Sequence, residues 1–137
     1  MLFRSLFIII IIIINSFNNN FIFFLNDVLQ LYPLNTDIKN SLKSIELISR
    51  VTPAIVIKVW YLNIYQPYKS FIDDGDISFF IDKNYSQDVS CISNANDILI
   101  IIDKIRGPIS SMSSANRLHT MKHIQNLSKL SLLYNDC

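Results

Sequence analysis

The stretch LFIIIIIIINSFNNNFIFFLNDVLQLY, residues 6–32, contains the change in composition that decides the organisation of the chain. The first 25 residues carry a single charge, on Arg4, whereas charged residues recur every few positions in the rest, among helix caps and turn residues. We therefore expect two parts: an apolar, low-complexity extension over residues 1–25 and a helical domain over residues 26–137.

Three roles are open for the extension. Its apolar run, Leu6–Ile14, covers about 13 Å as a helix, whereas a helix that spans a bilayer needs about 20 apolar residues. With Arg4 ahead, the run has the basic start and short apolar centre of a secretory signal, although no clear cleavage site follows. The extension could be a signal or weak anchor, an interfacial segment that docks on a membrane or on the domain, or a non-structural product of A/T-rich leader sequence.

Composition narrows the class of protein. A chain of 137 residues has room for one domain, and its apolar content of 50% is enough to build a core. Isoleucine is abundant, with 25 residues, and glycine is scarce, with 2. This skew is explained most simply by a preference for A/T-rich codons. A net charge of +1 gives no overall attraction to nucleic acid or membrane. Because Cys91 and Cys137 form no CxxC pair, we expect free thiols in a reducing compartment.

Caps and apolar spacing predict helices in the first half of the domain. Asn26 is expected to cap a short helix that Pro33 ends, and Thr36 to cap the next one. That second helix carries apolar residues with helical spacing at Ile38, Leu42, Ile45 and Ile48.

The pair Thr52-Pro53 predicts the start of a third helix. Residues 54–65 are apolar on nearly all sides, which suits a central buried helix, and Trp60 is expected to anchor the core. The β-branched residues of this segment leave a strand as the alternative.

The second half contains further start and stop signals. Gly75 is expected to end one short helix and Asp76 to cap another over residues 77–83, followed by a loop over residues 84–94. Ser93 or Asn94 would then cap a helix that ends at Gly107-Pro108. Its buried face is expected to consist of Ile98, Ile101, Ile102 and Ile105.

A last helix is predicted over residues 115–134. Its apolar residues recur every three positions, so the apolar surface winds around the helix and suits a groove between several helices better than a coiled coil. They are Leu118, Met121, Ile124, Leu127, Leu130 and Leu133. The chain is thus predicted to be all-α, a small irregular bundle of five to seven helices preceded by an apolar N-terminal segment.

The domain's charges are unevenly distributed. Residues 73–103 contain seven acids and one base, and residues 104–135 contain five bases and no acid. The two stretches could pack together and neutralise each other, or the bases could contact phosphate or an acidic partner. The candidate contact residues are Lys104, Arg106, Arg117, Lys122 and Lys129. No aromatic residue is interleaved among them, which disfavours a nucleic-acid platform.

Other candidate sites are weak. The run Asp73–Asp76 resembles a cation-binding loop, but Ile81 stands where an EF-hand needs Glu, so we expect a turn. His119 and His123 share a helical face, yet a metal site would need a third ligand from Cys91, Cys137 or a distant Asp. We therefore predict no metal site. The sequence contains no phosphate-binding glycine loop and no nucleophile elbow, so we predict no enzyme, catalytic residue or cofactor.

Part of the chain resembles a group of small uncharacterised proteins encoded by giant, nucleocytoplasmic large DNA viruses. The similar stretches are PYKSFIDDGDISFFIDKNYSQDV (residues 67–89), ILIIIDKIRGPI (98–109) and HTMKHIQNLSKLSLLY (119–134). The resemblance implies a helical fold, residence inside the infected host cell and no established activity. It carries over no catalytic residue.

These observations together favour a non-enzymatic helical module of a large DNA virus, in the host cytoplasm or in virions. Self-association or a protein partner would cover its remaining apolar surface. The first alternative is a membrane-associated protein held by residues 1–25. The second is nucleic-acid binding through residues 104–129, and nucleic acid is the least favoured partner.

Overall fold

The computed structural model describes residues 2–82 and 95–137, and within them all regular structure is helical. The helices are α1 (Leu2–Leu31), α2 (Thr36–Val51), α3 (Ile55–Trp60), a π-helical turn η1 (Tyr61–Tyr65), α4 (Lys69–Asp74), α5 (Ser78–Asp82), α6 (Ala95–Ser110) and α7 (Ser114–Asp136). The predicted all-α bundle is confirmed, and the apolar N-terminal segment predicted ahead of it forms the first part of α1. The predicted loop over residues 84–94 and the cap at Ser93 or Asn94 lie outside the described residues.

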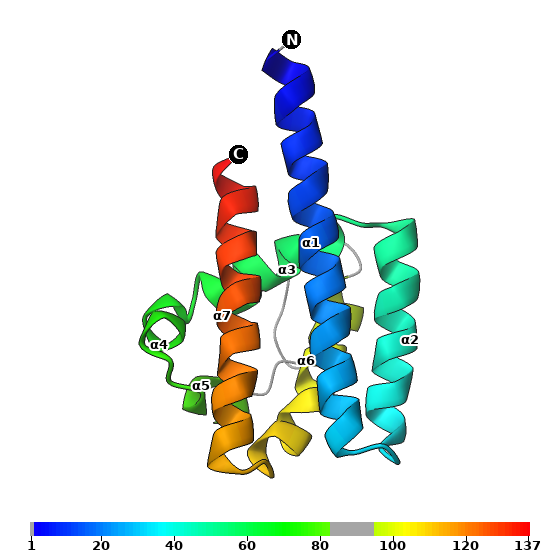
Figure 1. The fold of residues 1–137 in the computed structure, drawn as a ribbon, viewed down its shortest axis with the longest axis vertical. Coiled ribbons are helices and arrows are strands. Elements are labelled where there is room, and N and C mark those ends of the chain that lie inside the picture. Colours follow the sequence, from blue (N-terminus) through cyan, green and yellow to red (C-terminus); the bar gives the residue numbers. More distant parts are fainter. Residues whose placement is uncertain (1, 83–94) are drawn as a thin grey trace.

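The two longest helices, α1 and α7, pack side by side, with α2 on the other flank of α1 (Figure 1). The segment formed by α3 and η1 crosses this layer and also contacts α6. Trp60 at its centre is fully buried, and its indole Nε1–H donates a hydrogen bond of 3.0 Å to Ser128 Oγ on α7. The predicted central buried helix is therefore confirmed, and a strand at this position is ruled out.

Helix α1 runs without a break across the predicted boundary between residues 25 and 26. The prediction that Asn26 caps a new helix is wrong, because Asn26 is an exposed residue inside α1. The helix continues because its buried face has helical spacing on both sides of this position. Its fully or almost fully buried members are Phe17, Phe21, Phe24, Leu25 and Val28. Residues from both predicted parts thus share one core.

The asparagines before this boundary fit the helix because their amide groups donate to backbone carbonyls or reach solvent. Asn18 is buried, and its Nδ2 donates to the carbonyl of Pro53 over 2.9 Å. Asn20 donates to the carbonyl of Ser16 over 2.7 Å, and Asn19 is exposed. An Asn-rich segment can therefore stay helical where its apolar residues are buried.

Three helix ends differ from their prediction. Asn35, rather than Thr36, caps α2 by accepting from Ile38 N over 3.0 Å. Thr52 and Pro53 are part of a turn that the Ile55 N–H closes by donating to the carbonyl of Thr52, and α3 begins only at Ile55. Helix α6 continues through Gly107-Pro108 to Ser110, and the fully buried Ile109 holds this last turn against the core. The free energy gained by burying Ile109 offsets the loss of the backbone hydrogen bond that Pro108, which has no N–H, cannot donate.

The other end signals agree with the structure. Gly75 ends α4 in the left-handed conformation at φ 76°, and Asp76 Oδ1 accepts from Ser78 N at the start of α5. The predicted buried faces of α2 and α6 point to the core. The apolar stripe of α7 winds as expected: Met121, Ile124 and Leu127 are buried, whereas Leu118 and Leu133 at its ends are exposed.

Candidate functional site

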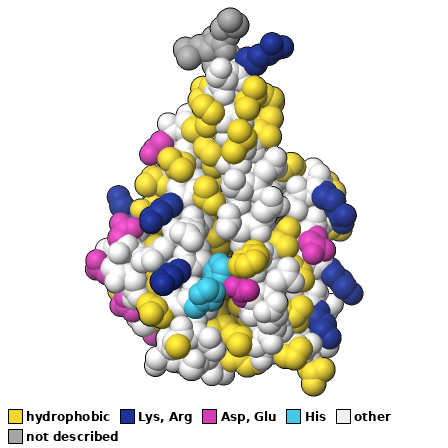
Figure 2. Space-filling view, viewed as in Figure 1, with side chains coloured by type: hydrophobic (Ala, Val, Ile, Leu, Met, Phe, Trp, Pro, Cys, Tyr) yellow, Lys and Arg dark blue, Asp and Glu magenta, His cyan; other side chains and the backbone are white. Residues whose placement is uncertain are grey.

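The N-terminal part of α1 extends beyond the bundle as an isolated apolar helix (Figures 1 and 2). We call residues 4–12 the α1 tip, because burial begins at Ile13. Six of its apolar side chains are 40–64% exposed: Leu6, Phe7, Ile8, Ile9, Ile11 and Ile12. Successive residues of a helix are rotated by about 100°, so these side chains point in every direction around the axis. The tip is therefore apolar on all sides, with Arg4 as its one charged residue.

The burial pattern separates the tip from the rest of α1. Burial begins at Ile13, and the aromatic rings of Phe17 and Phe21 then pack edge-on against Trp60, with centroid distances of 6.1 and 5.8 Å. By length and composition, Arg4–Leu31 could cross a membrane. Its C-terminal half is nevertheless part of the protein core, so only the tip can enter a membrane while the bundle stays folded.

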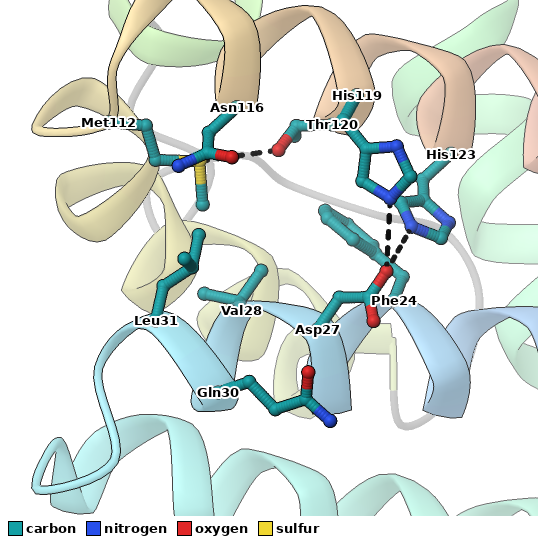
Figure 3. Close-up of a pocket in the computed structure, with 10 residues that line it drawn as sticks. All are labelled: Phe24, Asp27, Val28, Gln30, Leu31, Met112, Asn116, His119, Thr120 and His123. Atoms are coloured by element: carbon teal, nitrogen blue, oxygen red, sulfur yellow. Dashed lines mark hydrogen bonds and ion pairs between the residues drawn. The ribbon is translucent and has the colours of Figure 1, made fainter.

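The second feature is a cluster of metal-ligating side chains between α1 and α7 (Figure 3). One carboxylate oxygen, Oδ2 of Asp27, lies 2.7 Å from Nε2 of His123 and 3.3 Å from Nε2 of His119. The two histidines lie one turn apart on α7, and Asp27 lies on the facing side of α1. The packing of these two helices brings the three side chains together.

The neighbours of the cluster hold one histidine more firmly than the other. The ring of His123 stacks on Phe24 at a centroid distance of 5.2 Å, and its side chain is only 12% exposed. The side chain of His119 is 64% exposed. The cluster borders a cleft of about 190 Å³, whose other walls include Gln30, Asn116 and Thr120. A solvent molecule or small ligand could therefore reach the cluster from this cleft.

Sequence reasoning identified the two histidines but not the aspartate. A metal site on this helical face needs a third ligand from Cys91, Cys137 or a distant Asp, and the structure supplies Asp27, which is 92 residues from His119. Cys91 lies outside the described residues, and Cys137 is exposed. One signal could have drawn attention to Asp27: it is the only acidic residue in the first 36 positions.

The five candidate basic residues do not act as one free group. Lys104 Nζ lies 3.7 Å from Asp37 Oδ1. Arg106 Nη2 lies 3.2 Å from Asp103 Oδ1, and its Nη1 donates to the carbonyl of Ile81. Arg117 donates to the carbonyl of Ser110. The remaining two, Lys122 and Lys129, are exposed on α7. Three of the five therefore make contacts within the protein, which weakens the nucleic-acid hypothesis.

The acidic run of residues 73–76 forms the turn that we predicted. The hydroxyl of Tyr65 donates to Asp73 over 3.3 Å, and burial, followed by the charge of Asp73, raises the pKa of Tyr65. Hydrogen bonds from the side chain and backbone of Ser78 lower the pKa of Asp76. These carboxylates therefore serve local hydrogen bonds around Gly75.

Comparison with known proteins found no matching family, no matching curated protein and no matching solved structure. The resemblance to giant-virus proteins stays a prediction, and the function has to be argued from the geometry.

Proposed function

We propose that this protein is a membrane-associated helical protein that inserts the α1 tip into lipid. The observation that carries the proposal is an apolar helix exposed on all sides and joined rigidly to a folded bundle. Exposed apolar surface of this extent marks a site of contact with a membrane or another protein. This choice develops the first alternative from the sequence, anchoring through residues 1–25.

The distribution of exposure favours lipid over a protein groove. A helix that docks in a groove presents anchors on one face, spaced i, i+3, i+4 and i+7. The tip instead exposes consecutive residues, including Phe7, Ile8 and Ile9, which point in different directions. Lipid acyl chains contact a helix equally on all sides, so they satisfy this pattern without leaving an apolar face in water.

The length of the tip suits shallow insertion. Its nine residues cover about 13 Å, a little under half of a hydrocarbon core of about 30 Å. Deeper entry would bring the exposed Asn15 into the hydrocarbon and pull Asn18 and the buried phenylalanines out of the bundle. Insertion at a tilt lets the long side chain of Arg4 reach the phosphate headgroups while the isoleucines stay among the acyl chains.

Self-association is the competing proposal, in line with the interaction module expected from the sequence. Two copies could cover their tips by packing them together, because the same exposed isoleucines would drive that association. A single partner helix leaves much of an all-round apolar surface in water. Vesicle binding and oligomeric state distinguish the two proposals.

Vesicle flotation of the full chain tests the proposal. The protein is purified in detergent, diluted into phosphatidylcholine vesicles containing some anionic lipid, and centrifuged through a density gradient. The tip variant is Phe7→Gln/Ile8→Gln/Ile12→Gln. Its matched control, Leu34→Gln/Val51→Gln/Leu118→Gln, removes three apolar side chains elsewhere that are 63–88% exposed, against 51–64% for the three in the tip. We expect the wild type and the control to float and the tip variant to remain at the bottom.

Equal flotation of the tip variant and the control would exclude the tip as the membrane contact. A wild-type chain that ignores vesicles and forms a discrete dimer by light scattering would support self-association instead. Circular dichroism on all three proteins establishes that each is folded.

A further inference from the structure

We propose that Asp27, His119 and His123 form a binding site for a divalent transition-metal ion of the zinc type. The proposal is independent of membrane association, because the histidines, coloured cyan, lie on the body of the bundle and away from the projecting α1 tip (Figure 2), and Asp27 contacts them. It rests on two imidazole nitrogens and one carboxylate oxygen that converge from different helices.

The distances are those of a site that needs little rearrangement. All three ligand atoms lie within 4.8 Å of one another. In a tetrahedral zinc site with bonds of about 2.0 Å, neighbouring ligand atoms are about 3.3 Å apart. The separation of 3.3 Å between His119 Nε2 and Asp27 Oδ2 already meets this value. The separation of 2.7 Å between His123 and Asp27 is short and must open slightly around an ion.

The helices hold the ligands in place. His119 and His123 are four residues apart, the spacing that puts two imidazoles on one face of a helix and that zinc-binding helices use. Asp27 lies between Phe24 and Val28, whose buried side chains fix this part of α1 against the core. The ligand backbones are therefore positioned by packing, and the exposed His119 can adjust its ring.

The ligand types select the class of metal. Imidazole nitrogen with a carboxylate favours Zn²⁺, Co²⁺, Ni²⁺ or Fe²⁺, whereas Mg²⁺ and Ca²⁺ prefer oxygen ligands alone. Three protein ligands leave a further position for water or a small ligand, which can enter from the cleft lined by Gln30 and Asn116. The alternative is that the Asp27–His123 contact only ties α1 to α7 in a metal-free protein.

Metal titration of the full chain in detergent micelles tests the site. The protein carries no histidine tag, is kept reduced, and is titrated with Zn²⁺ by calorimetry and with Co²⁺ by visible absorption. We expect one Zn²⁺ per chain and Co²⁺ bands of a nitrogen- and oxygen-ligated ion. His119→Gln is the decisive variant because this exposed side chain can be replaced without disturbing the core.

We expect His119→Gln and Asp27→Asn each to weaken Zn²⁺ binding by at least about tenfold, the least that changes around metal sites usually cost. The control Asp37→Asn removes an exposed carboxylate from α2 and should leave binding unchanged. Equal affinity in all variants, absence of saturable binding, or thiolate-to-cobalt charge-transfer bands that place the metal on cysteine would each overturn the proposal. Flotation of the variants with vesicles stays as in the wild type, so failure here leaves membrane association intact.

Discussion

At the scale of single residues, Trp60 connects three helices. It lies on α3, contacts Phe17 and Phe21 of α1, and donates to Ser128 of α7. Ser128→Ala leaves the buried indole N–H without its acceptor, and we expect the free energy of unfolding to fall by about 1–3 kcal/mol. The control Ser131→Ala removes an equally buried hydroxyl together with its own bond, and should cost less. Urea unfolding compares the two; an equal or larger loss for Ser131→Ala would contradict this role of Ser128.

The carboxylate of Asp76 gives a pH-dependent prediction. Because hydrogen bonds from Ser78 lower its pKa in the folded protein, its contribution to stability is present above the ordinary carboxyl pKa of about 4 and is lost as pH falls through the lowered value. We expect Asp76→Ala to unfold at a lower urea concentration than the wild type at pH 7, and this difference in midpoint to shrink below about pH 4. Asp76→Asn keeps an acceptor without a charge, so it separates the effect of the hydrogen bond from the effect of the charge. A difference in stability between the wild type and Asp76→Ala that does not change with pH would contradict the prediction.

At the scale of elements, the two glycines have opposite roles. Gly75 ends α4 at φ 76°, where a Cβ would meet Gln125 at an ordinary 3.6 Å, so the cost of Gly75→Ala arises from the backbone and should be about 1–2 kcal/mol. Gly107 lies inside α6 with open space around it. Gly107→Ala should be neutral or stabilise by up to about 1 kcal/mol, because Pro108 offsets part of the gain in helix propensity. Thermal unfolding measures both, and equal losses would be inconsistent with these roles.

Helix α1 combines an exposed tip with a core segment, and truncation should separate them. A chain beginning at Asn15 keeps Phe17, Phe21 and Phe24 and is expected to fold. A chain beginning at Asn26 loses all three, and each buried phenylalanine contributes about 3–5 kcal/mol. Their summed loss is comparable to the whole free energy of unfolding of an ordinary domain, about 5–15 kcal/mol. We expect dispersed NMR spectra from the first chain and an unfolded spectrum from the second. A folded domain over residues 26–137 would contradict the shared core.

At the scale of the whole molecule, local signals predicted the fold class and tertiary packing decided the rest. Gly75, Asp76 and the apolar face of α6 act through nearby residues, so the sequence predicts them directly. The continuity of α1 depends on Phe17 and Phe21 meeting Trp60, a contact between distant parts of the chain. The sequence does not identify Asp27 as the third member of the histidine cluster, because Asp27 meets His123 only when α1 packs against α7.

The most direct test of membrane insertion is a depth measurement on α1. A spin label is placed at Ile9→Cys in the tip or at the exposed Leu34→Cys just beyond the other end of the helix, with Cys91 and Cys137 replaced by Ser. Paramagnetic resonance in vesicles then compares accessibility to oxygen, which concentrates in lipid, with accessibility to a water-soluble nickel chelate. We predict that position 9 is accessible to oxygen and protected from nickel, and that position 34 shows the reverse. Nickel accessibility at position 9 equal to that at position 34 would contradict insertion of the tip.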